Sequence, residues 1–246
     1  MINGKRVLGV IGGVGPMATV DFYKKLIEWT DASCDQEHIH VLIDGNAQIP
    51  DRTASILAGD KRPLPYLIDS ARRLEEAGAD LLVVACNAAH YFFDELEAAC
   101  TVPLLNMIDL TAREAARRGF SRVGLLAVDG TLYAGIYDRV FEACGLSLIR
   151  QDEPGQEKVM RLIYDEVKAG APIHREALYA TLDDMVKRGA ECFVLGCTEL
   201  PLVFSGCRDY VFLDPSAILA REAVRALGYP LKTTDPVETE DVHVLL

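Results

Sequence analysis

The sequence has no run of about eighteen apolar residues, the length a helix needs to cross a bilayer, so we expect no transmembrane segment. Positive charge is also scarce, because 37 Asp and Glu residues outnumber 25 Lys and Arg residues and the net charge is −12. Such a surface repels phosphate backbones and anionic lipids, which disfavours binding to nucleic acid or to a membrane. The first residues, MINGKRVLGVIGG, lack the apolar core and the cleavage site of a signal peptide, so we expect a cytoplasmic protein.

The cysteine and histidine patterns contain neither a disulfide framework nor a metal motif. Seven cysteines are an odd number, and without an export signal they favour free thiols in a reducing compartment. His38 and His40 alternate along a predicted strand close to Cys34, but no second ligand pair accompanies them. We therefore predict no metal site.

Short β-rich runs alternate with longer amphipathic stretches along the chain. RVLGVIGG predicts a strand and a glycine turn. The following TVDFYKKLIEWT predicts a helix with apolar Val20, Tyr23, Leu26 and Ile27 at helical spacing. DLLVVACN is a continuous apolar run, typical of a strand that is buried on both faces. The alternation predicts parallel strands with crossover helices, and hence an α/β fold.

The second half of the sequence repeats the first. SRVGLLAV matches KRVLGVIG, VKRGAECFVLGCT matches EEAGADLLVVACN, and FLDPSAILAREA matches LLNMIDLTAREA, in the same order along the chain. These matches predict two homologous α/β lobes related by a pseudo-twofold axis, each with a mostly parallel sheet flanked by helices. We place the N-terminal lobe at residues 1–100, completed by 211–230, the C-terminal lobe at 101–210, and a tail at 231–246.

Cys86 and Cys197 occupy matched positions of this repeat, each at the end of a predicted parallel strand. Ligands bind at the carboxyl ends of such strands, so the two thiols of facing lobes would point into one cleft from opposite sides. Inversion of a stereocentre needs that arrangement, because a base removes a proton from one face while an acid delivers one to the other. One strand-end cysteine would more often just fill core space, so the duplication carries the interpretation.

At these positions the chain resembles the aspartate/glutamate racemase family. The matching segments are GVIGGVGPMATVDFYKKL, QIPDRT, VVACNAAHYFFDEL, VGLLAVDGT, IYDEVKAG and VLGCTELPLVF. The resemblance implies two pseudosymmetric lobes with the active site in the cleft between them, a homodimer, and an amino-acid substrate. It also implies that Cys86 and Cys197 interconvert L- and D-aspartate, or glutamate, by two-base proton transfer without pyridoxal phosphate or another cofactor.

The same resemblance assigns roles around the two thiols. Arg52 and Lys168 would hold substrate carboxylates, a role that suits a guanidinium because it can donate two parallel hydrogen bonds. Ala88 departs from the family, which usually has threonine at that position, so one substrate contact differs. The other expected substrate-binding residues are Met17, Gln48, Asn87, Thr131 and Thr198, and the expected supporting residues are Asn46, His90 and Glu199.

Several alternatives remain open at this stage. GVGPMA follows a predicted strand and matches a relaxed dinucleotide-binding fingerprint, as in an NAD(P)-linked oxidoreductase. Against this, Pro16 removes one N–H from the phosphate cradle, and Asp44 comes later than the usual acidic residue. A non-catalytic amino-acid-binding protein also fits two lobes and a cleft, but it needs no pair of thiols. Within the superfamily, glutamate racemase and hydantoin racemase are the alternatives, and a hydantoin ring would not need Arg52 and Lys168.

Overall fold

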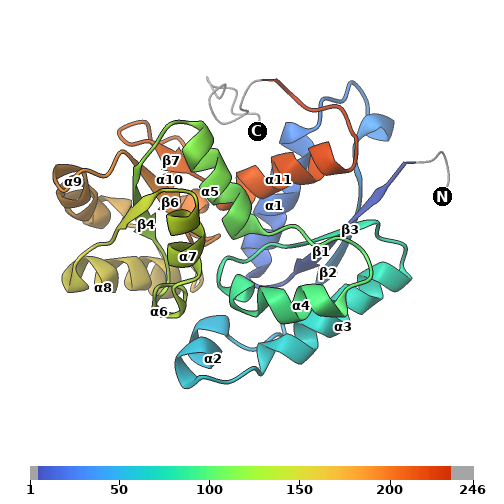
Figure 1. Cartoon of the computed structure of the whole chain (residues 1–246), viewed down its shortest axis with the longest axis horizontal. Helices are drawn as coiled ribbons and strands as arrows, with labels where there is room; N and C mark the ends of the chain where they lie inside the picture. The colour runs from blue at the N-terminus through green and yellow to red at the C-terminus, as the bar shows by residue number, and fades with distance from the viewer. Residues whose placement is uncertain (1–4, 234–246) are drawn as a thin grey trace.

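Two parallel sheets form the centres of two lobes in a computed structural model, which describes residues 5–233 (Figure 1). The first sheet has the order β2-β1-β3, and the second has the order β5-β4-β6-β7. The strands are β1 (Val7–Gly12), β2 (His40–Gly45), β3 (Leu81–Val84), β4 (Arg122–Leu126), β5 (Ser147–Ile149), β6 (Cys192–Leu195) and β7 (Phe212–Leu213). Every pairing between these strands is parallel, which confirms the predicted α/β fold.

Helices cover both sheets. Those between β1 and β4 are α1 (Pro16–Trp29), η1 (Asp35–Glu37), α2 (Arg52–Ala58), α3 (Pro63–Glu76), η2 (Ala88–Phe92), α4 (Phe93–Ala99) and α5 (Met107–Arg117). The later ones are α6 (Asp129–Ala134), α7 (Ile136–Ala143), α8 (Glu153–Arg161), η3 (Leu162–Val167), η4 (Arg175–Leu178), α9 (Tyr179–Lys187), α10 (Leu200–Phe204) and α11 (Pro215–Ala226). Within residues 5–233, none of the helices combines the length and the apolar character that a membrane span requires.

Burial explains why these strands lie at the centre. All four residues of β3 and all four of β6 are buried, as their continuous apolar sequence predicts for strands covered on both faces. One buried cluster contains Ile11 and Val84 from the first sheet and Leu126 and Leu195 from the second. The carboxyl ends of the central strands of both lobes therefore converge on one region.

All seven cysteines are free, as expected.

The buried face of α1 differs from the predicted one. Leu26 is buried together with Phe22, whereas Val20, Tyr23 and Ile27 are exposed. The helix carries apolar residues on both faces, so periodicity alone does not identify the face that packs. Contact with α11, which is distant in the sequence, decides it.

The segment 211–230 is divided between the two lobes. β7 pairs with β6 in the second sheet, whereas α11 packs against α1 and joins the buried cluster around Leu8 and Phe22. The strand therefore lies with the second sheet rather than with the first lobe, where it was expected, because β6 offers it an open parallel edge. The lobe boundaries themselves stay a prediction. Of the expected tail, Leu231 forms an antiparallel bridge with Thr30, and residues 234–246 lie outside the described part of the chain.

Candidate active site

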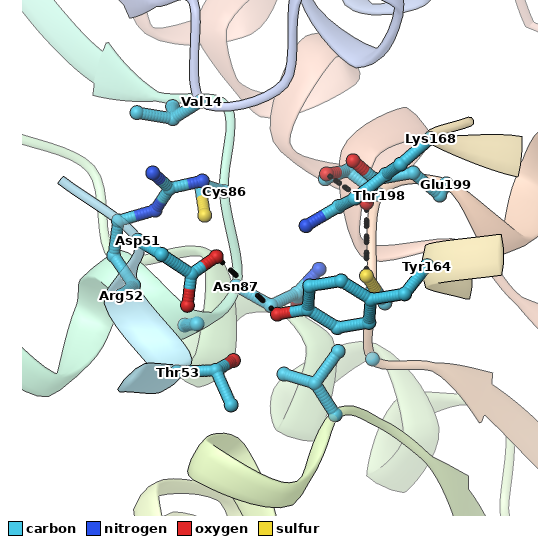
Figure 2. A pocket seen from close by; sticks show the side chains of 14 residues that line it. Val14, Asp51, Arg52, Thr53, Cys86, Asn87, Tyr164, Lys168, Thr198 and Glu199 are labelled. Atoms are coloured by element: carbon cyan, nitrogen blue, oxygen red, sulfur yellow. Dashed lines mark hydrogen bonds between the residues drawn. The ribbon is translucent and has the colours of Figure 1, made fainter. Parts of the chain in front are cut away.

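A small pocket lies between the two lobes, where β3 and β6 end (Figure 2). Cys86 follows β3 and Cys197 follows β6, and their residues are only 6% and 7% exposed. The pocket is lined by Val14, Asp51, Arg52, Thr53, Cys86, Asn87, Ala88, Val128, Tyr164, Lys168, Gly196, Cys197, Thr198 and Glu199. Its free volume is about 20 Å³, room for one water-sized molecule. Ligand pockets usually enclose roughly 300–1,000 Å³, so a substrate enters only after the lobes or their side chains move apart.

A buried positive charge lies beside Cys86. Arg52 is the first residue of α2, which begins here because Asp51 Oδ1 accepts a hydrogen bond from the Ala54 N–H at 2.7 Å. Arg52 Nη1 donates to the carbonyl of Pro50 at 3.0 Å, and its guanidinium lies beside the Cys86 side chain (Figure 2). Burial acts to lower the pKa of Arg52, but its interaction with Cys86 raises it above its ordinary value. The guanidinium therefore stays charged next to this sulfur.

A buried carboxylate lies beside Cys197. The thiol donates to Glu199 Oε2, with 2.9 Å between sulfur and oxygen, and Glu199 is 5% exposed. Burial, together with the negative charge of Glu199, raises the pKa of the Cys197 thiol well above its ordinary value. Lys168 acts in the opposite direction but does not outweigh these two effects. The surroundings of this cysteine favour the protonated thiol.

Tyr164 and Lys168 reach the pocket from the second lobe. Tyr164 lies in η3, a segment of π-helix, and its hydroxyl donates to Asp51 Oδ2 of the first lobe at 3.3 Å (Figure 2). Lys168 Nζ lies 4.2 Å from the centre of the Tyr164 ring, in a cation–π contact. Burial acts to lower the pKa of Lys168, but the charges of Glu199 and Cys197 raise it above its ordinary value. These two side chains therefore place a cation in the pocket and connect the lobes across it.

Two buried nitrogen atoms of the lining have no hydrogen-bond partner within residues 5–233: Arg52 Nε and Asn87 Nδ2. The Asn87 amide is held in place because its Oδ1 accepts a hydrogen bond from Tyr137 at 2.5 Å. An unpaired buried donor costs on the order of 1–3 kcal/mol, so an acceptor such as a carboxylate would be stabilised here. The pocket therefore offers unused donors next to Cys86.

The glycines of GVGPMA serve packing within the protein. A Cβ at Gly13 would lie 2.4 Å from the backbone of Asn46, and a Cβ at Gly15 would lie 2.7 Å from Glu199 Oε1. Gly13 also has a φ of 79°, in the left-handed region that favours glycine. These close approaches account for both glycines without a dinucleotide.

The structure brings together seven of the residues expected from the sequence. They are Arg52, Cys86, Asn87, Lys168, Cys197, Thr198 and Glu199. Five others do not line the pocket as described. Met17 and Gln48 are exposed, Asn46 accepts a hydrogen bond from the Gln48 N–H at 3.1 Å, and Thr131 is buried.

His90, the fifth, lies behind Cys86. Its Nε2 accepts a hydrogen bond from the Met107 N–H at 3.0 Å, so the proton of the neutral ring is on Nδ1, which donates to the Cys86 carbonyl at 2.9 Å. Burial lowers the pKa of His90 to about 4. The ring is therefore neutral near pH 7, and it fixes the turn after β3 against the start of α5.

Sequence interpretation missed Asp51, Thr53 and Tyr164 as lining residues. Asp51 and Thr53 flank Arg52 in QIPDRT, and Tyr164 lies in IYDEVKAG. The spacing of four residues between Tyr164 and Lys168 places the two side chains on one helical face, so it was the available signal. Among residues 5–233, no cluster of three His, Cys, Asp or Glu side chains has a metal-binding arrangement.

Comparisons with known proteins agree with this fold. A model of the family described as Asp/Glu/Hydantoin racemase matches residues 11–223. The chain is 28% identical over 223 residues to the broad specificity amino-acid racemase RacX of Bacillus subtilis, covering 89% of this chain and 96% of the relative. It is 30% identical over 188 residues to a glutamate racemase of Pseudomonas putida, covering 69% of this chain and 67% of the relative. The solved structure of the Picrophilus torridus aspartate racemase superimposes with a TM-score of 0.85 at 31% identity, covering 94% of this chain and 98% of that one. The chain therefore belongs to the Asp/Glu/hydantoin racemase family.

Proposed function

We propose that this protein interconverts the L- and D-forms of an acidic amino acid, with aspartate as the first candidate and glutamate as the second. Cys86 and Cys197 are the proton-transfer groups, and the reaction uses no pyridoxal phosphate. The observation that carries the proposal is that two buried thiols, from matched strand ends of the two lobes, line one small pocket. Similarity to an aspartate racemase over nearly the whole chain supports aspartate.

The different neighbours of the two thiols suggest how the protons are arranged at rest. We assign the resting thiolate to Cys86, which lies beside the charged Arg52, and the resting thiol to Cys197, which donates a hydrogen bond to Glu199. The Cys86 thiolate would then take the Cα proton, and the electron pair of the broken C–H bond would delocalise into the α-carboxylate. The Cys197 thiol would deliver its proton to the opposite face of Cα and become a thiolate. The other enantiomer uses the pair in the reverse direction.

Charge and donors in the pocket fit a substrate with carboxylates. Arg52 and Lys168 are its lining cations, and Arg52 Nε and Asn87 Nδ2 are donors without a partner in the described chain. Donors placed in advance at developing negative charge lower the barrier, because they need no reorganisation during the reaction. Closure of the pocket would exclude water and strengthen these interactions.

A racemase of wider substrate range is the alternative function. Ala88, which stands where the family usually has threonine, lines the pocket with a methyl group. The loss of a hydroxyl removes one polar contact that would select a substrate side chain. The printed name of the Bacillus subtilis relative, a broad specificity racemase, agrees with this candidate.

We also propose that the protein is a homodimer in the cytoplasm. Met17, Val20, Tyr23 and Ile27 lie exposed along α1, and an apolar patch of this kind is a common subunit interface. Light scattering of the purified chain during size-exclusion chromatography tests the oligomeric state. A mass equal to one chain would contradict the dimer without affecting the proposed reaction.

Incubation of the purified protein with L-aspartate, and separately with L-glutamate, in deuterated water without added pyridoxal phosphate tests the activity. We expect the D-isomer to form with deuterium at Cα. A Cys34→Ala variant, which removes an exposed thiol outside the pocket, serves as the matched control for pocket cysteine variants. If neither substrate gained deuterium or changed configuration, the proposed function would be refuted.

A further inference from the structure

A broad groove runs between α5 and α11, which lie next to each other between the two sheets (Figure 1). It encloses about 900 Å³, and none of its lining residues belongs to the cysteine pocket. α5 also packs against α7, and α11 packs against α1, so the groove lies where the two lobes join. It is therefore a second concave surface, separate from the proposed active site.

Positive charge is concentrated in this groove. Its lining contains six cations and two carboxylates, Glu114 and Glu222, and a third carboxylate, Asp109, pairs with Arg113 at 2.8 Å, which leaves a local charge of +3. The whole chain has a net charge of −12, so the groove opposes the general field. The six cations are Arg113, Arg117, Arg118, Arg221, Arg225 and Lys232.

Glu114 organises the floor of the groove. Its buried carboxylate accepts hydrogen bonds from Arg117 at 2.7 Å, Arg118 at 2.8 Å and Arg221 at 2.8 Å. Burial acts to raise the pKa of Glu114, but these arginines hold it well below its ordinary range. One negative charge therefore serves three guanidinium groups, each of which has five N–H donors.

The rim of the groove is open to solvent. The side chains of Arg113, Arg117 and Arg225 are 71%, 67% and 54% exposed, whereas Arg221 is 13% exposed and lies against the ring of Trp29. A fixed guanidinium on the floor and exposed guanidinium groups on two helices can contact one ligand from several sides.

We propose that this groove binds a small multivalent anion that carries two or more phosphate or carboxylate groups. Guanidinium groups match the geometry of phosphate and carboxylate oxygens and bind them through paired hydrogen bonds. A long polyanion such as nucleic acid is disfavoured, because it would extend beyond the groove over a negatively charged surface. A ligand in the groove touches helices that pack in both lobes. The site is independent of the proposed racemisation.

Calorimetric titration of the full-length protein at low salt tests this inference, with inorganic tripolyphosphate, pyrophosphate, orthophosphate and citrate as separate probes. We expect saturable binding of tripolyphosphate that weakens at high salt, with orthophosphate the weakest probe. Comparison of citrate with tripolyphosphate distinguishes a carboxylate ligand from a phosphate ligand.

The groove variant is Arg113→Gln, Arg225→Gln and Lys232→Gln, which leaves the Glu114 cluster intact. Its matched control is Arg62→Gln, Arg73→Gln and Lys187→Gln, exposed positions with the same change of charge. We expect the groove variant to weaken tripolyphosphate binding at least about tenfold and the control to weaken it less than about twofold.

Two results would overturn the inference directly: no saturable binding to the full chain, or equal weakening in the two variants. A third concerns the sequence after Thr233, which contains Asp235, Glu238, Glu240 and Asp241 but no Lys or Arg. If binding appeared only after these four residues were replaced by their amides, the inference would be overturned. The groove would then take the chain's own acidic C-terminal segment and not a separate anion.

Discussion

Cys86 and Cys197 occupy matched positions in the two lobes, yet charges of opposite sign lie beside them. A guanidinium lies beside the first, and a carboxylate accepts a hydrogen bond from the second. The sequence repeat makes the two thiols equivalent, whereas it pairs Glu199 with Ala88, and Arg52 comes from a segment outside the matched runs. The pair is therefore symmetric in position and asymmetric in electrostatics. This asymmetry matters for a two-base reaction, because the enzyme at rest would be ready for one enantiomer.

Single cysteine variants should separate proton exchange from inversion. In Cys197→Ala, Cys86 can still remove a proton and return deuterium to the same face of Cα, but nothing protonates the other face. We expect racemisation to fall by at least about 10²-fold, while one enantiomer still exchanges its Cα proton for deuterium. Chiral chromatography and mass spectrometry in deuterated water measure both quantities on one sample.

The reciprocal variant Cys86→Ala should show the same loss of racemisation, and in this variant the opposite enantiomer should exchange its Cα proton for deuterium. Cys34→Ala should retain the activity of the unmodified chain. Full racemisation by either pocket variant would rule out a mechanism that needs both thiols.

Replacement of Glu199 by Gln should lower the pKa of the Cys197 thiol. The carboxylate raises that pKa, and the amide keeps the shape while removing the negative charge. On a Cys86→Ala background, the pH at which Cys197 is alkylated at half its maximal rate should fall by about one unit or more. Mass spectrometry of the peptide that contains Cys197 follows the reaction.

Glu97→Gln, the same change on an exposed residue of α4, is the control and should leave that pH unchanged. In the enzyme with both thiols, Glu199→Gln should slow racemisation about tenfold or more, because the Cys197 thiol loses the charged acceptor that holds it in place. An unaltered alkylation profile would mean that Glu199 does not control this thiol.

The fold and the meeting of the two thiols in one pocket were accessible from the sequence for a definite physical reason. Buried parallel strands need continuous apolar runs, and the repeat places Cys86 and Cys197 at equivalent strand ends. The apolar runs specify each strand and its end locally, and the repeat relates the two strand ends by comparison of the two halves of the chain. These sequence patterns were therefore sufficient to predict the α/β fold, which the structure confirms.

Relations between distant segments were not accessible in this way. The contact of Tyr164 with Asp51 joins segments more than a hundred residues apart, and no local pattern encodes which hydroxyl meets which carboxylate. The packing face of α1 depends on α11 in the same manner, since Val20 and Phe22 are equally apolar in the sequence. The short β7 contains only Phe212 and Leu213, too few residues to indicate which sheet it joins.

Tyr164 should control access to the pocket. Its hydroxyl is hydrogen-bonded to Asp51 across the two lobes, and the pocket is too small for a substrate while that contact is made. In Tyr164→Phe, loss of a hydrogen bond to a charged acceptor should increase the population of open molecules. We expect alkylation of Cys86 by iodoacetamide to become about five- to tenfold faster.

Tyr210→Phe is a matched control, because Tyr210 also donates to a carboxylate, Asp183, but on the surface of the same lobe away from the pocket. It should leave the alkylation rate of Cys86 unchanged. Equal rates in the two variants would show that the Tyr164 contact does not hold the pocket closed.

The buried His90 should make the free energy of unfolding depend on pH. Burial lowers its pKa from 6.5 to about 4 in the folded protein, so between these values the unfolded chain binds more protons than the folded one. The contribution of the neutral ring is complete above pH 6.5 and is lost as the pH falls towards 4. The difference corresponds to about 3 kcal/mol over this interval.

Urea unfolding at pH 7.5 and at pH 5 measures this dependence, and His90→Gln should reduce it while also lowering stability at pH 7.5. The loss at pH 7.5 is expected because the Met107 N–H and the Cys86 carbonyl lose the ring that bridges them. His174→Gln replaces a histidine whose side chain is 65% exposed, and it should leave the difference between the two pH values nearly intact. If His90→Gln and the unmodified chain lost equal stability on acidification, groups other than His90 would account for the pH dependence. His90 would then not be a buried ring that stays neutral.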